Sequence, residues 1–198
     1  MKLFLSGLLL FTLCLSTSLA TAQEDHEALR LSLSRLRDKN DLSLSFLNFQ
    51  EELKNKTTQI KTDGQYYGFG LSFNRRSYRG YYAYSFGGGA AYGYAVAGSS
   101  GSAYHEKRIP WQSFFAHVGA YRRLSAYFEV GPVAMLQYKS IDWPASGSDE
   151  MEAPPNPSGG VFLEFRQRLG KEFDLFQNIG ILGPSQQAAW NLGFSYNL

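Results

Sequence analysis

The 198-residue chain lacks several features on which common classes of protein depend. Its only cysteine is Cys14, so a disulfide framework and a thiolate metal site are excluded. None of its three histidines has a His or Cys partner at metal-ligand spacing, and no glycine motif leads into a helix as a phosphate-binding loop does. The net charge of +2 is too small for a nucleic-acid footprint. We therefore expect no metal, no cofactor and no nucleic-acid partner.

Long apolar runs are absent after the first residues. Lys2 supplies a basic start, residues 3–15 are an apolar run, and residues 20–22 fit a small-residue cleavage site, a layout typical of a signal peptide. That run is too short for a spanning helix, and no later segment approaches eighteen apolar residues. We predict that residues 1–22 are a cleaved signal peptide. The mature chain then has no cysteine, and only the charge of Lys2 is lost.

What the chain does contain is a high content of aromatic residues and glycine: 13 Tyr, 15 Phe, 3 Trp and 20 Gly. Large residues alternate with small or polar ones, which is typical of strands because successive side chains point to opposite faces. Eight segments show this pattern: 41–50, 65–74, 81–96, 111–122, 125–138, 160–168, 173–182 and 188–198.

The links between these segments alternate in length. Residues 75–80, 121–125 and 169–172 are short, 51–63, 97–110 and 139–159 are longer, and 183–187 falls in the place of a longer one. Outer-membrane barrels have short periplasmic turns and longer outer loops. A sheet inside a membrane must close on itself, because an open edge would leave backbone groups without hydrogen-bond partners. Residues 41–198 are therefore predicted to form a closed, antiparallel, eight-stranded transmembrane β-barrel.

The last eleven residues carry a family resemblance. Trp190, Leu192, Phe194, Tyr196 and Leu198 share one parity, and small polar residues occupy the other. The segment resembles the closing strand of small bacterial outer-membrane β-barrels, although that family usually ends in Phe or Trp. The resemblance implies an outer-membrane location, contact with membrane lipids and lipopolysaccharide, insertion by the barrel-insertion machinery, and a monomer. It carries over no functional residue.

The large residues of the alternating segments are expected to face lipid, with the aromatic ones forming interfacial girdles. The set is Tyr67, Phe69, Leu71, Phe73, Tyr82, Tyr84, Phe86, Trp190, Leu192, Phe194, Tyr196 and Leu198.

Three regions are harder to interpret. Residues 23–40, assigned to the periplasm, are acidic at the start and basic at the end, which favours a short amphipathic helix, although Leu29, Leu31 and Leu33 also alternate as in a strand. Gly87–Gly89 indicates a bulge or a strong bend. Pro132 lacks a backbone donor and is expected at a bulge or strand rim.

One polar pair invites a chemical interpretation. A hairpin centred on Arg123 would place His117 opposite Glu129, both facing the lumen. Such a pair could support acyl-ester chemistry, as in barrel enzymes that modify lipid A. We favour a structural role, in which His117, Glu129, Glu164 and Arg166 form an internal network, because unpaired buried charges are costly.

An eight-stranded barrel has an interior narrow enough for side chains to fill. The favoured function is therefore a non-enzymatic integral outer-membrane protein with a structural or surface-interaction role. One alternative is a lipid A-modifying barrel enzyme. The other is a secreted soluble barrel, whose large residues would line a cavity for an apolar ligand.

Overall fold

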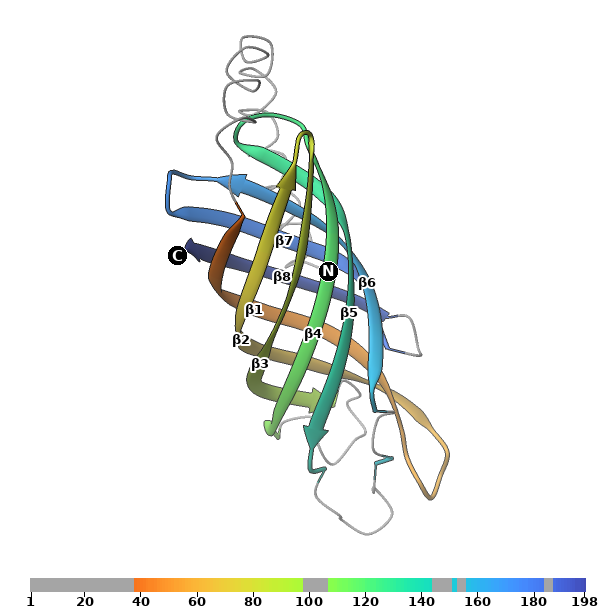
Figure 1. Ribbon diagram of the computed structural model, residues 1–198. Coiled ribbons are helices and arrows are strands. Elements are labelled where there is room, and N and C mark those ends of the chain that lie inside the picture. The colour runs from red at the N-terminus through yellow and green to blue at the C-terminus, as the bar shows by residue number, and fades with distance from the viewer. Residues whose placement is uncertain (1–37, 98–106, 144–150, 153–155, 184–186) are drawn as a thin grey trace.

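The computed structural model describes residues 38–97, 107–143, 151–152, 156–183 and 187–198. These residues form a closed antiparallel barrel in which each strand pairs with its neighbours in sequence and β8 pairs with β1 (Figure 1). The predicted fold class is confirmed. The predicted signal peptide and most of segment 23–40 lie outside the described residues, but Lys39 and Asn40 belong to β1. The strands are β1 (Lys39–Lys54), β2 (Lys61–Arg79), β3 (Tyr82–Ala97), β4 (Ile109–Arg123), β5 (Phe128–Ile141), β6 (Ser158–Arg168), β7 (Phe173–Leu182) and β8 (Gln187–Asn197).

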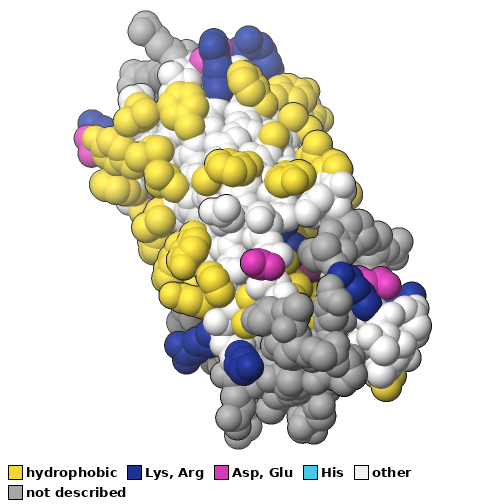
Figure 2. Space-filling view, turned by 90° about the horizontal axis from the view of Figure 1, so that it is seen from below, with side chains coloured by type: hydrophobic (Ala, Val, Ile, Leu, Met, Phe, Trp, Pro, Cys, Tyr) yellow, Lys and Arg dark blue, Asp and Glu magenta, His cyan; other side chains and the backbone are white. Residues whose placement is uncertain are grey.

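Alternation along each strand separates an outer face from an inner one. In β2, Phe69 is 63% exposed on the outside, whereas Gly68 and Gly70 are buried. Phe194 in β8 is 54% exposed, and Ser195 beside it is fully buried. Figure 2 shows apolar side chains spread over the visible wall, with Lys and Arg near its two ends. Large residues on the outside contradict the alternative of a soluble barrel that encloses an apolar ligand.

The register of the strands sets the stagger of the barrel. A row of paired residues that starts at Lys39 passes through Arg76, Ser85, Gly119, Val133, Phe162, Gly180 and Ala189, and returns to β1 at Phe49. The row therefore returns ten residues further along β1. For eight strands, a stagger of that size tilts the strands by roughly 40° from the barrel axis.

The connections divide the barrel into two ends. The turns 80–81, 124–127 and 169–172 lie at one end together with Leu198, and we call this the turn end. The connections β1–β2, β3–β4, β5–β6 and β7–β8 lie at the other, which we call the loop end. The β1–β2 hairpin is longer than predicted, because residues 51–54 and 61–63 continue the strands, and it projects beyond the barrel in Figure 1.

Of the two features predicted at Gly87–Gly89, a bulge or a strong bend, the bulge is absent. These glycines pair in unbroken register with residues 72–74 of β2 and 115–117 of β4. The reason for glycine is close approach: a Cβ at Gly88 would lie 2.9 Å from the Phe115 carbonyl oxygen. Glycine here lets the backbones approach without changing the register.

Pro132 lies neither at a bulge nor at a rim. It pairs with Leu163 inside the β5–β6 ladder. On its other side, the β4–β5 ladder is interrupted between the pairs Gly119↔Val133 and Arg122↔Val130, and the same register resumes beyond the gap. An interrupted ladder accommodates the missing N–H of proline without an inserted residue.

Candidate functional site in the barrel lumen

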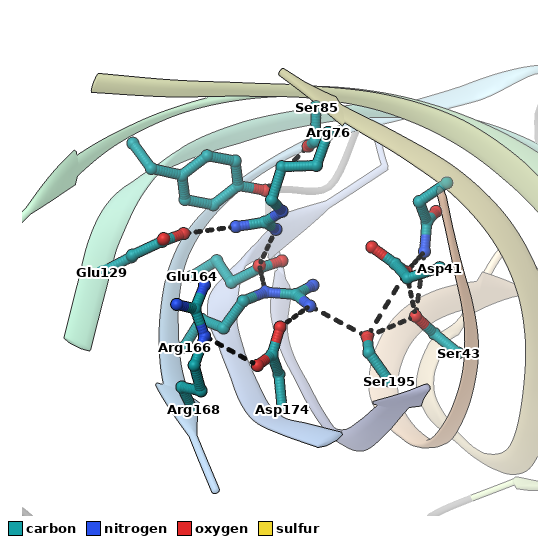
Figure 3. A network of polar contacts seen from close by, with 12 residues as sticks. Asp41, Ser43, Arg76, Ser85, Glu129, Glu164, Arg166, Arg168, Asp174 and Ser195 are labelled. Atoms are coloured by element: carbon teal, nitrogen blue, oxygen red, sulfur yellow. Dashed lines mark hydrogen bonds and ion pairs between the residues drawn. The ribbon is translucent and has the colours of Figure 1, made fainter. Parts of the chain in front are cut away.

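The turn-end half of the lumen contains a network of buried charged residues (Figure 3). Every member comes from the inward parity of its strand, so the alternation that turns apolar residues outward also collects these groups inside. Four arginines balance four carboxylates, so the network has no formal net charge. The charged members are the buried Arg76, Arg123, Arg166, Asp41, Glu129, Glu164 and Asp174, and the half-buried Arg168.

Arg76 of β2 joins two opposite parts of the wall. Its Nη1 donates to Glu129 Oε2 of β5 at 2.5 Å, and its Nη2 donates to Glu164 Oε1 of β6 at 3.3 Å. Its guanidinium carbon lies 4.4 Å from the centre of the Tyr121 ring. With only 2% of its surface exposed, Arg76 requires these partners, because a buried unpaired charge is costly.

Arg166 continues the network toward β1 and β8. Its Nε donates to Glu164 Oε1 at 3.0 Å, and its Nη1 donates to Ser195 Oγ at 2.9 Å. The Ser195 and Ser43 hydroxyls lie 2.6 Å apart, and Ser43 Oγ donates to Asp41 at 2.9 Å. Asp174 of β7 lies 3.6 Å from Arg166 Nη1. Ion pairs and hydrogen bonds thus cross the bore between strands that are far apart in sequence.

The predicted register of the β4–β5 hairpin is wrong. His117 pairs with Met135, and Glu129 pairs with Arg123, so His117 and Glu129 are not cross-strand neighbours. The turn occupies residues 124–127 rather than 121–125. The strand continues through 121–123 because Tyr121 and Arg123 both pack into the lumen.

Of the four residues predicted to form a polar network, the structure brings together Glu129, Glu164 and Arg166. His117 borders a cavity and stacks on Phe115, with ring centroids 6.3 Å apart. It makes no hydrogen bond or ion pair to another side chain in the described strands.

Sequence reasoning missed five charged members, Arg76, Arg123, Arg168, Asp41 and Asp174. Residues 75–80 and 121–125 were assigned to links, so the parity of Arg76 and Arg123 was not considered. Continuing the inward set of β2 from Ser72 and Asn74 by two residues reaches Arg76. In the same way, Asp174 lies on the inward parity of a strand whose bounds were predicted correctly.

The loop-end half of the lumen is filled by aromatic rings. Phe49 and Tyr66 stack with centroids 4.7 Å apart, and Trp111 meets them edge-on at 5.4 and 6.1 Å. Trp111 Nε1 donates to the Tyr67 carbonyl oxygen at 3.2 Å. Lys139 forms an ion pair with Glu51, and its Nζ lies 4.1 Å from the Tyr66 ring centre. This group closes the lumen largely by packing, with one charge pair.

Parts of the β5–β6 connection cover this aromatic group. Trp143 and Met151 are both buried in the same apolar cluster as Leu53 and Trp111. Met151 forms a β-bridge with Asn55, and the Glu152 N–H donates to the Lys54 carbonyl oxygen at 2.8 Å. The connection is therefore attached to the projecting β1–β2 hairpin.

Between the two halves lies a cavity of about 60 Å³. Polar residues such as His117 and Asn178 line it together with apolar ones such as Phe162 and Leu182. This volume holds a few water molecules. No group of three His, Cys, Asp or Glu side chains among the described residues could hold a metal ion. No helix in the described segments is long and apolar enough to span a membrane.

Comparisons with known proteins identify relatives by fold only. No family model and no curated protein matches the sequence. The outer membrane protein OprG from Pseudomonas aeruginosa is similar in structure with a TM-score of 0.51, at 11% identity over 82% of this chain and 96% of OprG. The attachment invasion locus protein Ail of Yersinia pestis, solved with the heparin analogue sucrose octasulfate, has the same TM-score at 12% identity over 82% of this chain and 100% of Ail. The chain thus has the fold of the small eight-stranded barrels of the bacterial outer membrane.

Proposed function

We propose that the protein is a non-enzymatic integral protein of the bacterial outer membrane, in which a barrel filled with side chains supports the envelope or displays its loop end to partners. The observation that carries the proposal is the outer wall. Each of the eight strands carries at least one large apolar residue on its outside that is more than 40% exposed, for example Leu44, Phe86 and Phe114. Soluble monomers rarely expose so large a continuous apolar surface, whereas lipid covers it without cost.

The proposal of a non-enzymatic role rests on how the lumen groups are engaged. Glu129 and Glu164 are each bound by an arginine. A general base needs access to a reacting group, and these carboxylates already serve as partners of buried cations. His117, the candidate base, is separated from Glu129 by the observed register.

The packing of the lumen also argues against bulk transport of solutes. The charged network fills one half and the aromatic group the other, with a cavity of about 60 Å³ between them. The loop end therefore remains as the surface for partners. We further propose lipids and lipopolysaccharide as the surroundings of the wall, and the barrel-insertion machinery as the route of assembly. A monomeric state fits a closed sheet that has no unpaired edge to join to another copy.

The full chain, expressed in a Gram-negative host, tests the proposal by membrane fractionation and gel mobility. We expect it in the outer-membrane fraction, and we expect unboiled protein to migrate faster than boiled protein because the barrel stays folded in detergent. A Phe69→Arg variant should reduce the folded fraction, since a cation in the middle of the lipid face costs about 2–4 kcal/mol. Recovery as a soluble periplasmic protein, with Phe69→Arg folding as well as the wild type, would refute the proposal.

A further inference from the structure

The outer surface at the turn end is not uniform around the barrel. Each strand has one outward residue that lies closest to the turn end. These residues are Asn40, Arg79, Tyr82, Arg122, Phe128, Gln167, Phe173 and Tyr196, in order from β1 to β8. Only those of β2 and β4 are charged, and both are arginines. Positive charge on the outer wall at this end is therefore concentrated on one side, over β2, β3 and β4.

Three of these residues form a single row. Arg79 pairs with Tyr82, and Tyr82 pairs with Arg122, so the tyrosine lies between the two arginines. Neighbouring strands are about 4.8 Å apart, which places the two arginine Cα atoms roughly 10 Å from each other. All three side chains are exposed on the outside. We call this row the Arg–Tyr–Arg row. Two arginine side chains at this spacing can converge on one ligand in front of the tyrosine.

The charge of this region is only partly neutralised. Asp38 lies 3.5 Å from Arg79 and 3.7 Å from Arg75, which is also on the outer face of β2. These are long contacts between exposed groups, and such pairs are weak. In the described part of the chain, Arg122 has no carboxylate partner. Among the described residues, three arginines against one aspartate give this side a net charge of +2.

Apolar side chains continue from the row toward the middle of the barrel. Tyr84 and Phe86 follow Tyr82 on the outer face of β3 and are 51% and 57% exposed. A ligand with an anionic head and an apolar tail would meet complementary groups along one line: guanidinium groups, then a tyrosine, then an apolar wall. That combination describes a phospholipid at the membrane interface.

We propose that the Arg–Tyr–Arg row binds the phosphate of an anionic phospholipid in the leaflet at the turn end, which is the periplasmic leaflet if the short turns face the periplasm. A guanidinium group can donate two hydrogen bonds to the oxygens of one phosphate, and it stays charged at the membrane interface. Tyrosine is favoured at headgroup depth. The inference rests on the proposed function, because it requires the barrel to span a membrane.

The test uses the full-length barrel in nanodiscs that contain phosphatidylcholine with a minority of phosphatidylglycerol. Native mass spectrometry then counts the phosphatidylglycerol molecules that remain bound. An arginine near an anionic surface contributes about a fivefold change in binding, so Arg79→Gln/Arg122→Gln should weaken retention roughly twentyfold. The control Arg108→Gln/Lys171→Gln removes two exposed positive charges outside the row, one at the loop end and one in the turn 169–172, and should lose far less retention.

Gel mobility of the same samples distinguishes failure of the lipid site from failure of the proposed function. If the barrels insert and migrate as folded protein, but the wild type shows no preference for phosphatidylglycerol or the arginine variant retains it equally, the lipid site is refuted and the proposed function stands. If the wild type does not insert at all, both proposals fail. The variant Arg79→Lys/Arg122→Lys keeps the positive charges but lacks the planar guanidinium groups that bind a phosphate through two hydrogen bonds. It should lose only part of the phosphatidylglycerol retention.

Discussion

The two halves of the lumen fill the same narrow space by different means. At the turn end, Arg76 and Arg166 bind carboxylates from β5, β6 and β7. At the loop end, Trp111 and its aromatic neighbours exclude water by contact, and Lys139–Glu51 is an ion pair within them. The first half depends on every charge keeping its partner. The second depends mainly on volume and shape.

The two halves of the lumen should therefore lose stability through different kinds of substitution. Loss of one ion leaves another ion buried without compensation, so the charged half should respond strongly to a single substitution. Loss of an apolar side chain leaves a cavity whose cost depends on how far the neighbours relax. Three substitutions test this comparison, in order of decreasing expected effect.

Arg76→Met should have the largest effect, because it leaves Glu129 and Glu164 each without one of their cations. We expect the free energy of unfolding to fall by about 3–5 kcal/mol, measured by urea titration of the barrel in lipid vesicles. The control is Arg75→Met, which removes an exposed outward arginine from the neighbouring position and should cost less than about 1 kcal/mol. Equal losses in the two variants would show that the buried network does not stabilise the turn-end half.

Leu53→Ala should have a smaller effect at the loop end. Leu53 is 1% exposed and packs in the apolar cluster with Trp111 and Met151. We expect a loss of about 2–3 kcal/mol in the same titration, since truncating a buried leucine removes contacts and leaves a cavity. Ile60→Ala, at the exposed tip of the same hairpin, should change the stability by under about 0.5 kcal/mol. A neutral Leu53→Ala would mean that this cluster is not packed in solution.

Gly68→Ala tests how tightly the aromatic group is packed. The added Cβ would lie 2.6 Å from the Tyr92 carbonyl oxygen and 2.7 Å from Trp111 Cζ2. Moving both the indole and the Tyr92 backbone away from this Cβ should cost about 1–2 kcal/mol. In Gly159→Ala the nearest atom is 3.9 Å away, so unfolding should be unchanged. If Gly68→Ala is as stable as the wild type, Trp111 has room to move and the loop-end half is looser than the charged half.

The local alternation of residues was enough to predict where each of the eight strands lies in the sequence, although not the full length of every strand. Residues 173–182 were predicted with the bounds that β7 has, because alternation there is bordered by polar turn residues on one side and glycine on the other. β1 and β2 were predicted too short, since charged residues such as Glu51 and Arg76 read as loop residues until their inward parity is considered. The pattern of hydrophobic residues alone therefore understates a strand whose inner face is charged.

The local pattern of residues did not predict the register between neighbouring strands. The β4–β5 turn lies three residues beyond the predicted centre, and this shift separates His117 from Glu129. A hairpin of basic and small residues can turn at several positions at similar cost. The observed turn lets Arg123 reach Glu129, which is a contact that appears only when the strands are paired.

Parity along a strand depends only on the order of residues, so the amino-acid sequence was enough to predict an eight-stranded barrel with large residues outside and small or polar ones inside. Tertiary structure alone decided which inward residues meet: Arg76 with Glu129 and Glu164, Phe49 with Tyr66 and Trp111. The physical reason is that contacts across a bore depend on closure and stagger, which are properties of the whole ladder of pairs and not of any one strand.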